Sequence, residues 1–208
     1  MKKLFFLFML LLFTVTAFSQ KKNKHELRLE EVNLVIDSLS QYYTVVEEGV
    51  LISRVIQAPD YKKDALFVKV LEVTSSIYVD SKEVIQTQDK EEGIIFGKGQ
   101  FQETKYDKIS GAREICTIHH NLKIEVKDGR FKVSITLNQT NLAYYMMNGV
   151  KSWEYEYSIL NFYPFSQAIK LKHKDDSFNR IKFGITNALS VLDIFEQKTK
   201  KEETNDDW

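Results

Sequence analysis

The chain has 208 residues, of which 43% are hydrophobic and 28% are charged, and this balance is ordinary for a globular domain with a sizeable core. Its 29 basic and 29 acidic residues cancel, so the chain lacks the net positive charge that attracts nucleic acid, and no nucleic-acid partner is expected. Its single cysteine, Cys116, cannot form an internal disulfide, so the stability of the fold must come from packing.

The first twenty residues have the pattern of a secretory signal peptide. Two lysines precede an apolar run over residues 4–13, and Ala17 and Ser19 occupy the −3 and −1 positions of a cleavage site. Cleavage before Gln20 predicts a mature chain of 189 residues with a net charge of −2. The apolar run is shorter than the ~20 residues that a spanning helix needs, so no transmembrane segment is expected in the mature chain. We expect export to the periplasm or the extracellular space.

A strand and a helix are the first elements predicted for the folded domain. Residues 45–57 have the alternating pattern of a strand, and Pro59 ends it. Asp60 is placed to cap a helix that begins at Tyr61. The apolar residues of this helix recur at helical spacing, at Leu66, Val70, Val73 and Ile77. Since the helix is apolar on one side, we expect it to lie on a sheet.

Residues 84–101 predict a β-hairpin. Strand-like alternation is followed by a hydrated turn at residues 90–93 and by a second strand from Ile94. The second strand contains Gly97 and Gly99, which share a face, and this indicates close approach by a helix or a crossing strand. A phosphate-binding loop would need a helix after the glycines, whereas another strand is expected here.

A second hairpin turns at Asp128-Gly129, a pair that favours a type I′ turn. The turn predicts the pairs Lys127 with Arg130, Val126 with Phe131, Ile124 with Val133, Leu122 with Ile135, and His120 with Leu137. Every apolar pair lies on one face. The opposite face pairs Glu125, Lys123, Asn121 and His119 with Lys132, Ser134, Thr136 and Asn138. One side of the sheet is therefore buried, and the other is wetted or covers something polar.

A final helix is predicted from about Ser177, capped by Asp175 or Asp176, to about Lys198. Its apolar stripe contains Phe178, Ile181, Ile185, Ala188, Leu189, Leu192 and Phe195. The order strand, helix, four strands, helix, with both helices apolar on one side, predicts an α+β fold. In this fold an antiparallel sheet has its helices packed on one face.

Four segments together resemble a family of secreted Gram-negative bacterial proteins. They are Ala58-Pro59, Val84-Ile85-Gln86, residues 89–101, and residues 122–131 with their Lys-Asp-Gly-Arg turn. The family is known as a domain of unknown function with a TATA-binding-protein-like fold. The resemblance covers about residues 45–140. It implies this fold and no established activity, so it assigns no site residues.

The sequence departs from that family in two places. It has Ile77-Tyr78 where the family often has a tryptophan, and residues 141–165 are longer and more aromatic than expected. The predicted organisation is a signal peptide at residues 1–19, an N-terminal segment at 20–44, a TATA-binding-protein-like domain at 45–198 with an aromatic-rich insertion at 141–165, and a charged tail at 199–208. Residues 27–43 allow a short helix, an edge strand or a segment that docks only on a partner.

Cys116, His119 and His120 form the cluster that most resembles a metal or nucleophile site. Successive strand residues point to opposite faces, so the two histidines cannot bind one ion. Cys116 and His120 lie roughly 13 Å apart along a strand, which is too far for a thiolate–imidazole hydrogen bond. We expect a packed His120 with a satisfied ring, a solvent-facing His119 and a buried Cys116. No catalytic residue, metal or cofactor is assigned.

The candidate contact residues for a partner are the aromatic side chains Tyr144, Tyr145, Trp153, Tyr155 and Tyr157. The last three alternate with polar residues, which is the periodicity of a strand. Facing inward, they would belong to the core. Facing outward, they would form an apolar patch suited to a glycan ring or a peptide.

The sequence does not identify a biochemical activity. The main hypothesis is a non-catalytic envelope module that binds or assembles with a peptide, a protein or a glycan. One alternative is a hydrolase-like enzyme in which His119 meets Asp107, Glu125 or Lys123 only in three dimensions, and it requires a pocket with perturbed titratable groups. Another is a carrier of a small apolar ligand, which requires a cavity between sheet and helices.

Overall fold

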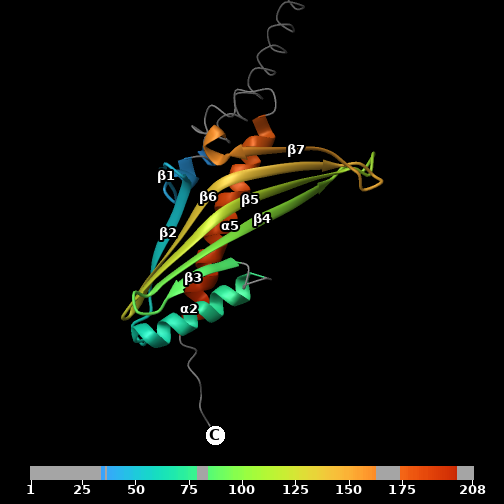
Figure 1. Ribbon diagram of the computed structural model, residues 1–208. Coiled ribbons are helices and arrows are strands. Elements are labelled where there is room, and N and C mark those ends of the chain that lie inside the picture. Colours follow the sequence, from blue (N-terminus) through green and yellow to red (C-terminus); the bar gives the residue numbers. More distant parts are fainter. Residues whose placement is uncertain (1–33, 36, 79–83, 163–173, 201–208) are drawn as a thin grey trace, which may run out of the picture. The chain divides into compact units, whose positions relative to one another are not determined.

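The computed structural model describes residues 34–35, 37–78, 84–162 and 174–200 (Figure 1). The chain divides into two compact units, residues 1–41 and residues 42–208. In the first unit the described residues from 34 to 40 are helical, so this part of the predicted N-terminal segment is a helix. The predicted signal peptide and the tail from residue 201 onward lie outside the described residues.

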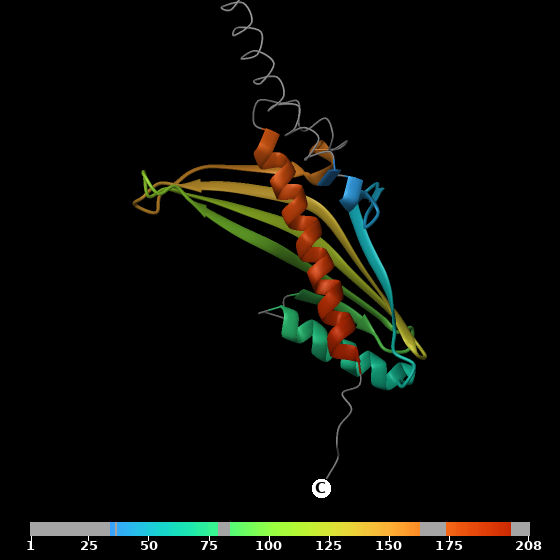
Figure 2. The ribbon, with the colours of Figure 1, turned by 180° about the vertical axis from the view of Figure 1, so that it is seen from behind.

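The second unit contains a sheet and two long helices. In chain order its elements are β1 (Thr44–Val46), β2 (Gly49–Gln57), α2 (Lys63–Ile77), β3 (Ile85–Asp89), β4 (Ile94–Tyr106), β5 (Arg113–Lys127), β6 (Arg130–Tyr145), β7 (Lys151–Ser158), the 3-10 helix η1 (Ile159–Phe162) and α5 (Lys174–Thr199). Within the described residues the strands form one antiparallel sheet in the order β1-β2-β6-β5-β4-β3, and β7 pairs with β6. Figure 2 shows α5 crossing one face of this sheet, with α2 beside its C-terminal end. The predicted α+β architecture is confirmed.

The buried side chains of the sheet lie on the face that carries the helices. β5 contributes every second residue from Cys116 to Val126, and β6 contributes every second residue from Phe131 to Leu137. The ring of Phe131 meets that of Phe195 in α5, with 6.2 Å between centroids. The intervening residues face away from the helices, as expected for a sheet that is buried on one side.

The predicted strand at residues 45–57 is divided into two. A turn at Glu47-Glu48 interrupts it, so β1 and β2 form a short hairpin. Gly49, which opens β2, has a φ of 149°. An added Cβ there would lie 1.9 Å from the carbonyl oxygen of Leu137 on β6, so this position requires glycine.

Helix α2 begins at Lys63 rather than at Tyr61, and Asp60 does not cap it. The carboxylate of Asp128, in the β5–β6 turn, accepts a hydrogen bond from the Lys63 amide at 2.9 Å. A residue distant in sequence thus satisfies one of the amides that a helix start leaves without an intrahelical partner. The predicted apolar stripe is confirmed at Leu66, Val70 and Val73, which are buried together with Phe67, whereas Ile77 is partly exposed.

Helix α5 begins at Lys174, before the predicted start at Ser177. Asp175 and Asp176 therefore lie inside the helix and not at its cap. Its last residue, Thr199, follows the predicted end at Lys198 directly. The predicted stripe is buried at Ile181, Ile185, Ala188, Leu192 and Phe195, and Leu189 is half-buried. The side chain of Phe178 lies outside the described part of the chain.

The β5–β6 hairpin has the predicted register over its first half. All five predicted pairs from Lys127–Arg130 to His120–Leu137 are present. The predicted type I′ turn is wrong. Such a turn needs a positive φ at both central residues, and only Gly129, with a φ of 68°, has one. The pairing is thus set by the two-residue loop even though its backbone differs from the expected one.

The predicted pair of His119 with Asn138 is wrong. His120 pairs with Leu137 and His119 pairs with Gln139, so Asn138 is an extra residue in β6, a β-bulge. After the bulge the buried residues of β6 change from odd to even positions, as Thr140 shows. The partner strand changes at the same place, since residues 130–137 pair with β2 and residues 139–145 pair with β7.

The explanation of Gly97 and Gly99 by close packing is confirmed. A Cβ on Gly99 would lie 2.6 Å from Nε2 of His120 and 2.7 Å from the ring of Tyr78. A Cβ on Gly97 would lie 2.9 Å from the carbonyl oxygen of Val84. The space that these side chains would fill is therefore occupied by neighbours on the helix-bearing side of the sheet.

Gly99→Val should lower the free energy of unfolding by about 1–3 kcal/mol or more, because the new side chain has to displace the His120 and Tyr78 rings. Gly97→Val should act in the same direction. Urea unfolding measures both effects. Lys98→Val, on the exposed face of the same strand, is the control and should change stability little. Equal stability of Gly99→Val and Lys98→Val would contradict the packing explanation.

Candidate functional site

An ion pair links the N-terminal half of α5 to the start of β5. Nη2 of Arg180 lies 3.0 Å from Oε1 of Glu114 on β5, and the two side chains are 11% and 25% exposed. Because both charges are largely removed from water, each depends on the other for compensation. The pair therefore adds a polar link between α5 and β5 to the apolar packing of the helix.

The strand register places side chains of β4, β5, β6 and β7 in rows across the helix-bearing face. One row is Lys105, Glu114, Tyr144 and Trp153, and the next is Glu103, Cys116, Leu142 and Tyr155. Each row is charged at β4 and aromatic at β7. This face consequently offers two chemically different strips.

The aromatic strip contains four of the five predicted contact residues. The rings of Tyr144 and Trp153 are stacked with 5.4 Å between centroids and 8° between planes. Tyr155 continues the row at 5.4 Å from Trp153, and Tyr157 follows at 6.1 Å from Tyr155. We call these four residues the aromatic row.

The aromatic row matches neither of the two simple alternatives. Its rings lie on the helix-bearing face, yet they are not core residues. Tyr155 is 55% exposed, and Tyr144, Trp153 and Tyr157 are half-buried. Tyr145 does not join the row, because it points to the opposite face, where the Arg113 guanidinium lies 5.0 Å from its ring centroid.

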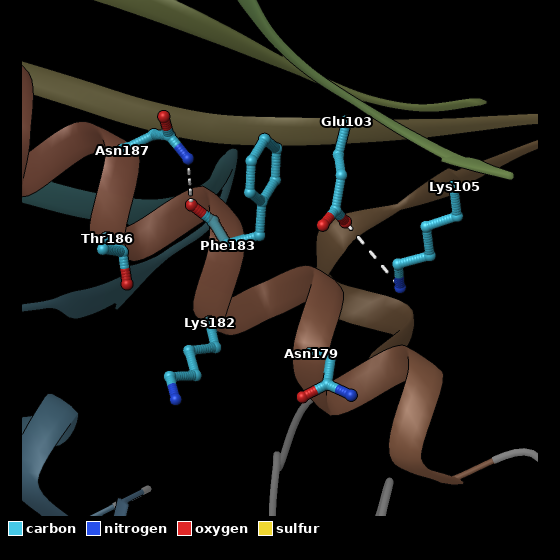
Figure 3. A pocket seen from close by; sticks show the side chains of 7 residues that line it. All are labelled: Glu103, Lys105, Asn179, Lys182, Phe183, Thr186 and Asn187. Carbon is cyan, nitrogen blue, oxygen red and sulfur yellow. Dashed lines mark hydrogen bonds and ion pairs between the residues drawn. The ribbon is translucent and has the colours of Figure 1, made fainter. Parts of the chain in front are cut away.

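A pocket of about 360 Å³ lies between β4 and α5 on the charged strip (Figure 3). Its lining residues are Glu103, Lys105, Asn179, Lys182, Phe183, Thr186 and Asn187. Two of their polar groups are already engaged, since Lys105 lies 3.7 Å from Glu103 and Asn187 donates to the carbonyl of Phe183 at 2.8 Å. The lining includes no histidine or cysteine. It can form hydrogen bonds with a small polar group, and it does not hold a nucleophile beside a histidine base.

The groups considered for a hydrolase site do not converge. Asp107 lies in the β4–β5 turn, where a hydrogen bond from the Ser110 hydroxyl at 2.7 Å lowers its pKa. That turn leads into β5 at Arg113, and His119 lies six residues further along the strand, roughly 20 Å from Arg113. Lys123 forms an ion pair with Glu125 at 3.0 Å. These side chains therefore do not form one catalytic set.

His120 and Cys116 are buried on the helix-bearing face, as predicted. The His120 ring stacks on Phe101 with 4.2 Å between centroids, and its Nε2 lies 2.8 Å from the Tyr78 hydroxyl. The expectation that the ring has hydrogen-bond partners is therefore confirmed for Nε2 only. Nδ1 is buried without a partner among the described residues.

Burial keeps these core groups neutral. It lowers the pKa of His120 to about 4, raises the pKa of the Cys116 thiol to about 11, and raises the pKa of the Tyr78 hydroxyl. A thiol with so high a pKa is a poor nucleophile at neutral pH. In the described ranges no three histidine, cysteine or acidic side chains are arranged to hold a metal ion. No described helix is long and apolar enough to cross a membrane.

An antiparallel sheet with its helices on one face defines an α+β domain of the TATA-binding-protein-like class. Residues 53–137 match the family described as a domain of unknown function (DUF4468) with TBP-like fold. This match confirms, for residues 53–137, the resemblance found in the sequence.

The solved structures that are similar to the chain include the following two. One is a DUF4468 family protein from Bacteroides ovatus, with a TM-score of 0.51 and 14% identity over 78% of this chain and 93% of that chain. The other is a TBP-like protein from Parabacteroides distasonis, with a TM-score of 0.50 and 14% identity over 76% of this chain and 98% of that chain. At this identity the likeness shows the fold alone. Comparison with curated proteins gave no match.

The pKa of His120 predicts a pH-dependent stability. Between about pH 6.5 and pH 4 the unfolded chain binds a proton that the folded chain excludes. The free energy of unfolding should therefore fall as the pH decreases through this range, by up to about 1.4 kcal/mol per pH unit from this group. Urea unfolding at a series of pH values measures the slope.

His120→Gln should remove this part of the slope, because glutamine does not titrate. His119→Gln, on the other face of β5, should leave most of it in place. The same pH dependence in wild type and His120→Gln would show that the buried imidazole does not exclude the proton.

Proposed function

We propose that the protein is a non-catalytic binding module of the bacterial envelope, which holds an extended segment of a partner protein along β7. The observation that carries this proposal is the combination of an edge strand with the aromatic row. Among the described residues β7 pairs with β6 alone, so its second edge has backbone groups suited to a further strand.

The two faces of β7 define the segment that fits. On the helix-bearing face the rings of Trp153, Tyr155 and Tyr157 provide apolar contacts. On the opposite face lie Glu154 and Glu156, which β6 amide side chains hold in place by hydrogen bonds. Since side chains of an added strand alternate between the faces, a segment with apolar residues on one side and basic or polar residues on the other is complementary.

The position of the perturbed titratable groups supports a non-catalytic role. Tyr78, Cys116 and His120 have the largest pKa changes among the described groups, and each is mostly buried. None of them lines the pocket on the charged strip. Catalytic sites usually place such groups in an accessible cleft.

Selection of a displayed random-peptide library on the purified protein should recover peptides with alternating apolar and basic residues. Tyr155→Ala should weaken binding of a selected peptide by about tenfold, because it removes the most exposed ring of the aromatic row. Tyr145→Ala is the matched control, since that ring lies on the other face, and it should bind like wild type. Titration calorimetry measures the affinities.

Two results would overturn this assignment. Equal affinities of wild type and Tyr155→Ala would place the peptide elsewhere. Binding to a glycan array that Tyr155→Ala abolishes, with no peptide recovered, would make the occupant of the aromatic row a glycan.

We further propose that residues 1–19 direct export to the periplasm or the extracellular space and are then removed. The support is the order of basic, apolar and small residues in this segment. Mass spectrometry of the protein from a Gram-negative host should show a chain that begins at Gln20. Ala17→Arg should block processing and leave the longer chain, whereas Lys22→Ala should be processed normally. A full-length wild-type chain in the cytoplasm would contradict export.

A further inference from the structure

Two turns meet at one end of the sheet. The β4–β5 turn and the β6–β7 turn lie together where β4, β5, β6 and β7 converge, at the end away from α2 (Figures 1 and 2). They are in contact, since a Cβ added to Gly111 would lie 2.9 Å from Cγ of Met147. We call residues 105–113 and 145–151 the tip.

The tip gathers exposed apolar side chains. Five of the eleven large apolar side chains that are exposed in the described residues lie there, namely Tyr106, Ile109, Met146, Met147 and Val150. Ile109 is 99% exposed and Met147 is 80% exposed. Such a concentration on one small projecting surface is unusual for a protein that contacts only water.

Hydrogen bonds within each turn hold these side chains outward. The Asp107 carboxylate accepts from the Ile109 amide at 2.9 Å and from the Ser110 hydroxyl at 2.7 Å. Oδ1 of Asn148 accepts from the Val150 amide at 3.1 Å. The apolar residues therefore stand on two turns of defined shape.

A row of tyrosines and cations, to which Tyr106 belongs, lies directly behind the other four apolar residues. The register aligns Tyr106, Arg113, Tyr145 and Lys151 in one row across β4, β5, β6 and β7. Over the whole tip there are four basic residues, Lys105, Lys108, Arg113 and Lys151, and one acidic residue, Asp107. Lys105 lies 3.7 Å from Glu103, and Lys151 forms an ion pair with Glu154. With these two glutamates included, the four cations exceed the three carboxylates by one, and the excess positive charge comes from Lys108 and Arg113 against Asp107.

We propose that the tip inserts into the surface of an anionic lipid bilayer. The order of its layers corresponds to that of a membrane boundary, where apolar side chains enter the hydrocarbon, tyrosines occupy the interface, and cations meet anionic head groups. The convex shape also favours a bilayer over a protein, because protein interfaces bury their apolar anchors in well-packed pockets of the partner. The inserted tip would hold the molecule at a membrane without a spanning helix.

A fluorophore at the outermost position tests this insertion directly. Cys116 is buried, so Ile109→Cys in the processed chain that begins at Gln20 can be labelled with an environment-sensitive nitrobenzoxadiazole group at one site. With phosphatidylcholine–phosphatidylglycerol vesicles the emission should rise and shift to shorter wavelength, and quencher groups on the acyl chains should reduce it. The response should weaken with pure phosphatidylcholine and at high salt. Val68→Cys, at an exposed position on α2, carries the control label. The emission of this label should remain that of a group in water with every vesicle composition and salt concentration.

Unlabelled variants measure how much the tip contributes to vesicle binding. The double change Ile109→Asp and Met147→Asp should reduce sedimentation with anionic vesicles by at least about tenfold, because it places charge where apolar contact is needed. Val68→Asp should bind as wild type does.

A label at position 109 that stays in water at every lipid concentration would overturn the proposal. So would a change in oligomeric state on replacing Ile109 and Met147 in the absence of lipid, because the tip would then be a contact between copies of the chain. Thermal unfolding confirms that each variant is folded, as expected for residues with so few buried contacts.

Discussion

The pairing of β5 with β6 is the constraint on which the rest of the domain depends. β6 pairs with β5 along one edge and with β2 and then β7 along the other. The bulge at Asn138 separates these halves and reverses which side chains face the helices. If Asn138 paired regularly with His119 instead, Asn141 and Ala143 would face the helices, and Tyr144 would lie on the open face. The aromatic row therefore depends on one bulged residue several positions away in the same strand.

Much of the fold was predictable from local pattern, whereas features set by distant contacts were not. Asp128-Gly129 fixed the first pairs of the hairpin because a two-residue loop leaves the strands little freedom. The bulge could not be seen in the hydrophobic pattern, because every residue between Leu137 and Leu142 is polar and uncharged. None of these residues indicates which face of the strand is buried. The cap of α2 was missed because its carboxylate comes from another element.

The candidate sites were predictable as strands and turns but not as surfaces. Alternation identified the strand around Trp153, yet the exposure of its rings depends on the bulge and on where α5 crosses the sheet. The pocket joins β4 to α5, and no spacing in the sequence relates these elements. Ile109 sits in a polar turn, so periodicity gave no reason to single it out. Its proximity to Met147 follows from the common end point of four strands.

The hydrogen bond from the Lys63 amide to Asp128 joins residues 65 positions apart. The same turn also binds the approach to α2, since the Gly129 amide donates to the carbonyl of Tyr61. In the unfolded chain α2 lacks these partners, and its many β-branched residues give it a weak intrinsic tendency to be helical. A cap of this kind contributes about 1 kcal/mol, so the first turn of α2 is most stable once the β5–β6 hairpin has formed. The Asp128 carboxylate therefore couples the start of the helix to the turn of the sheet.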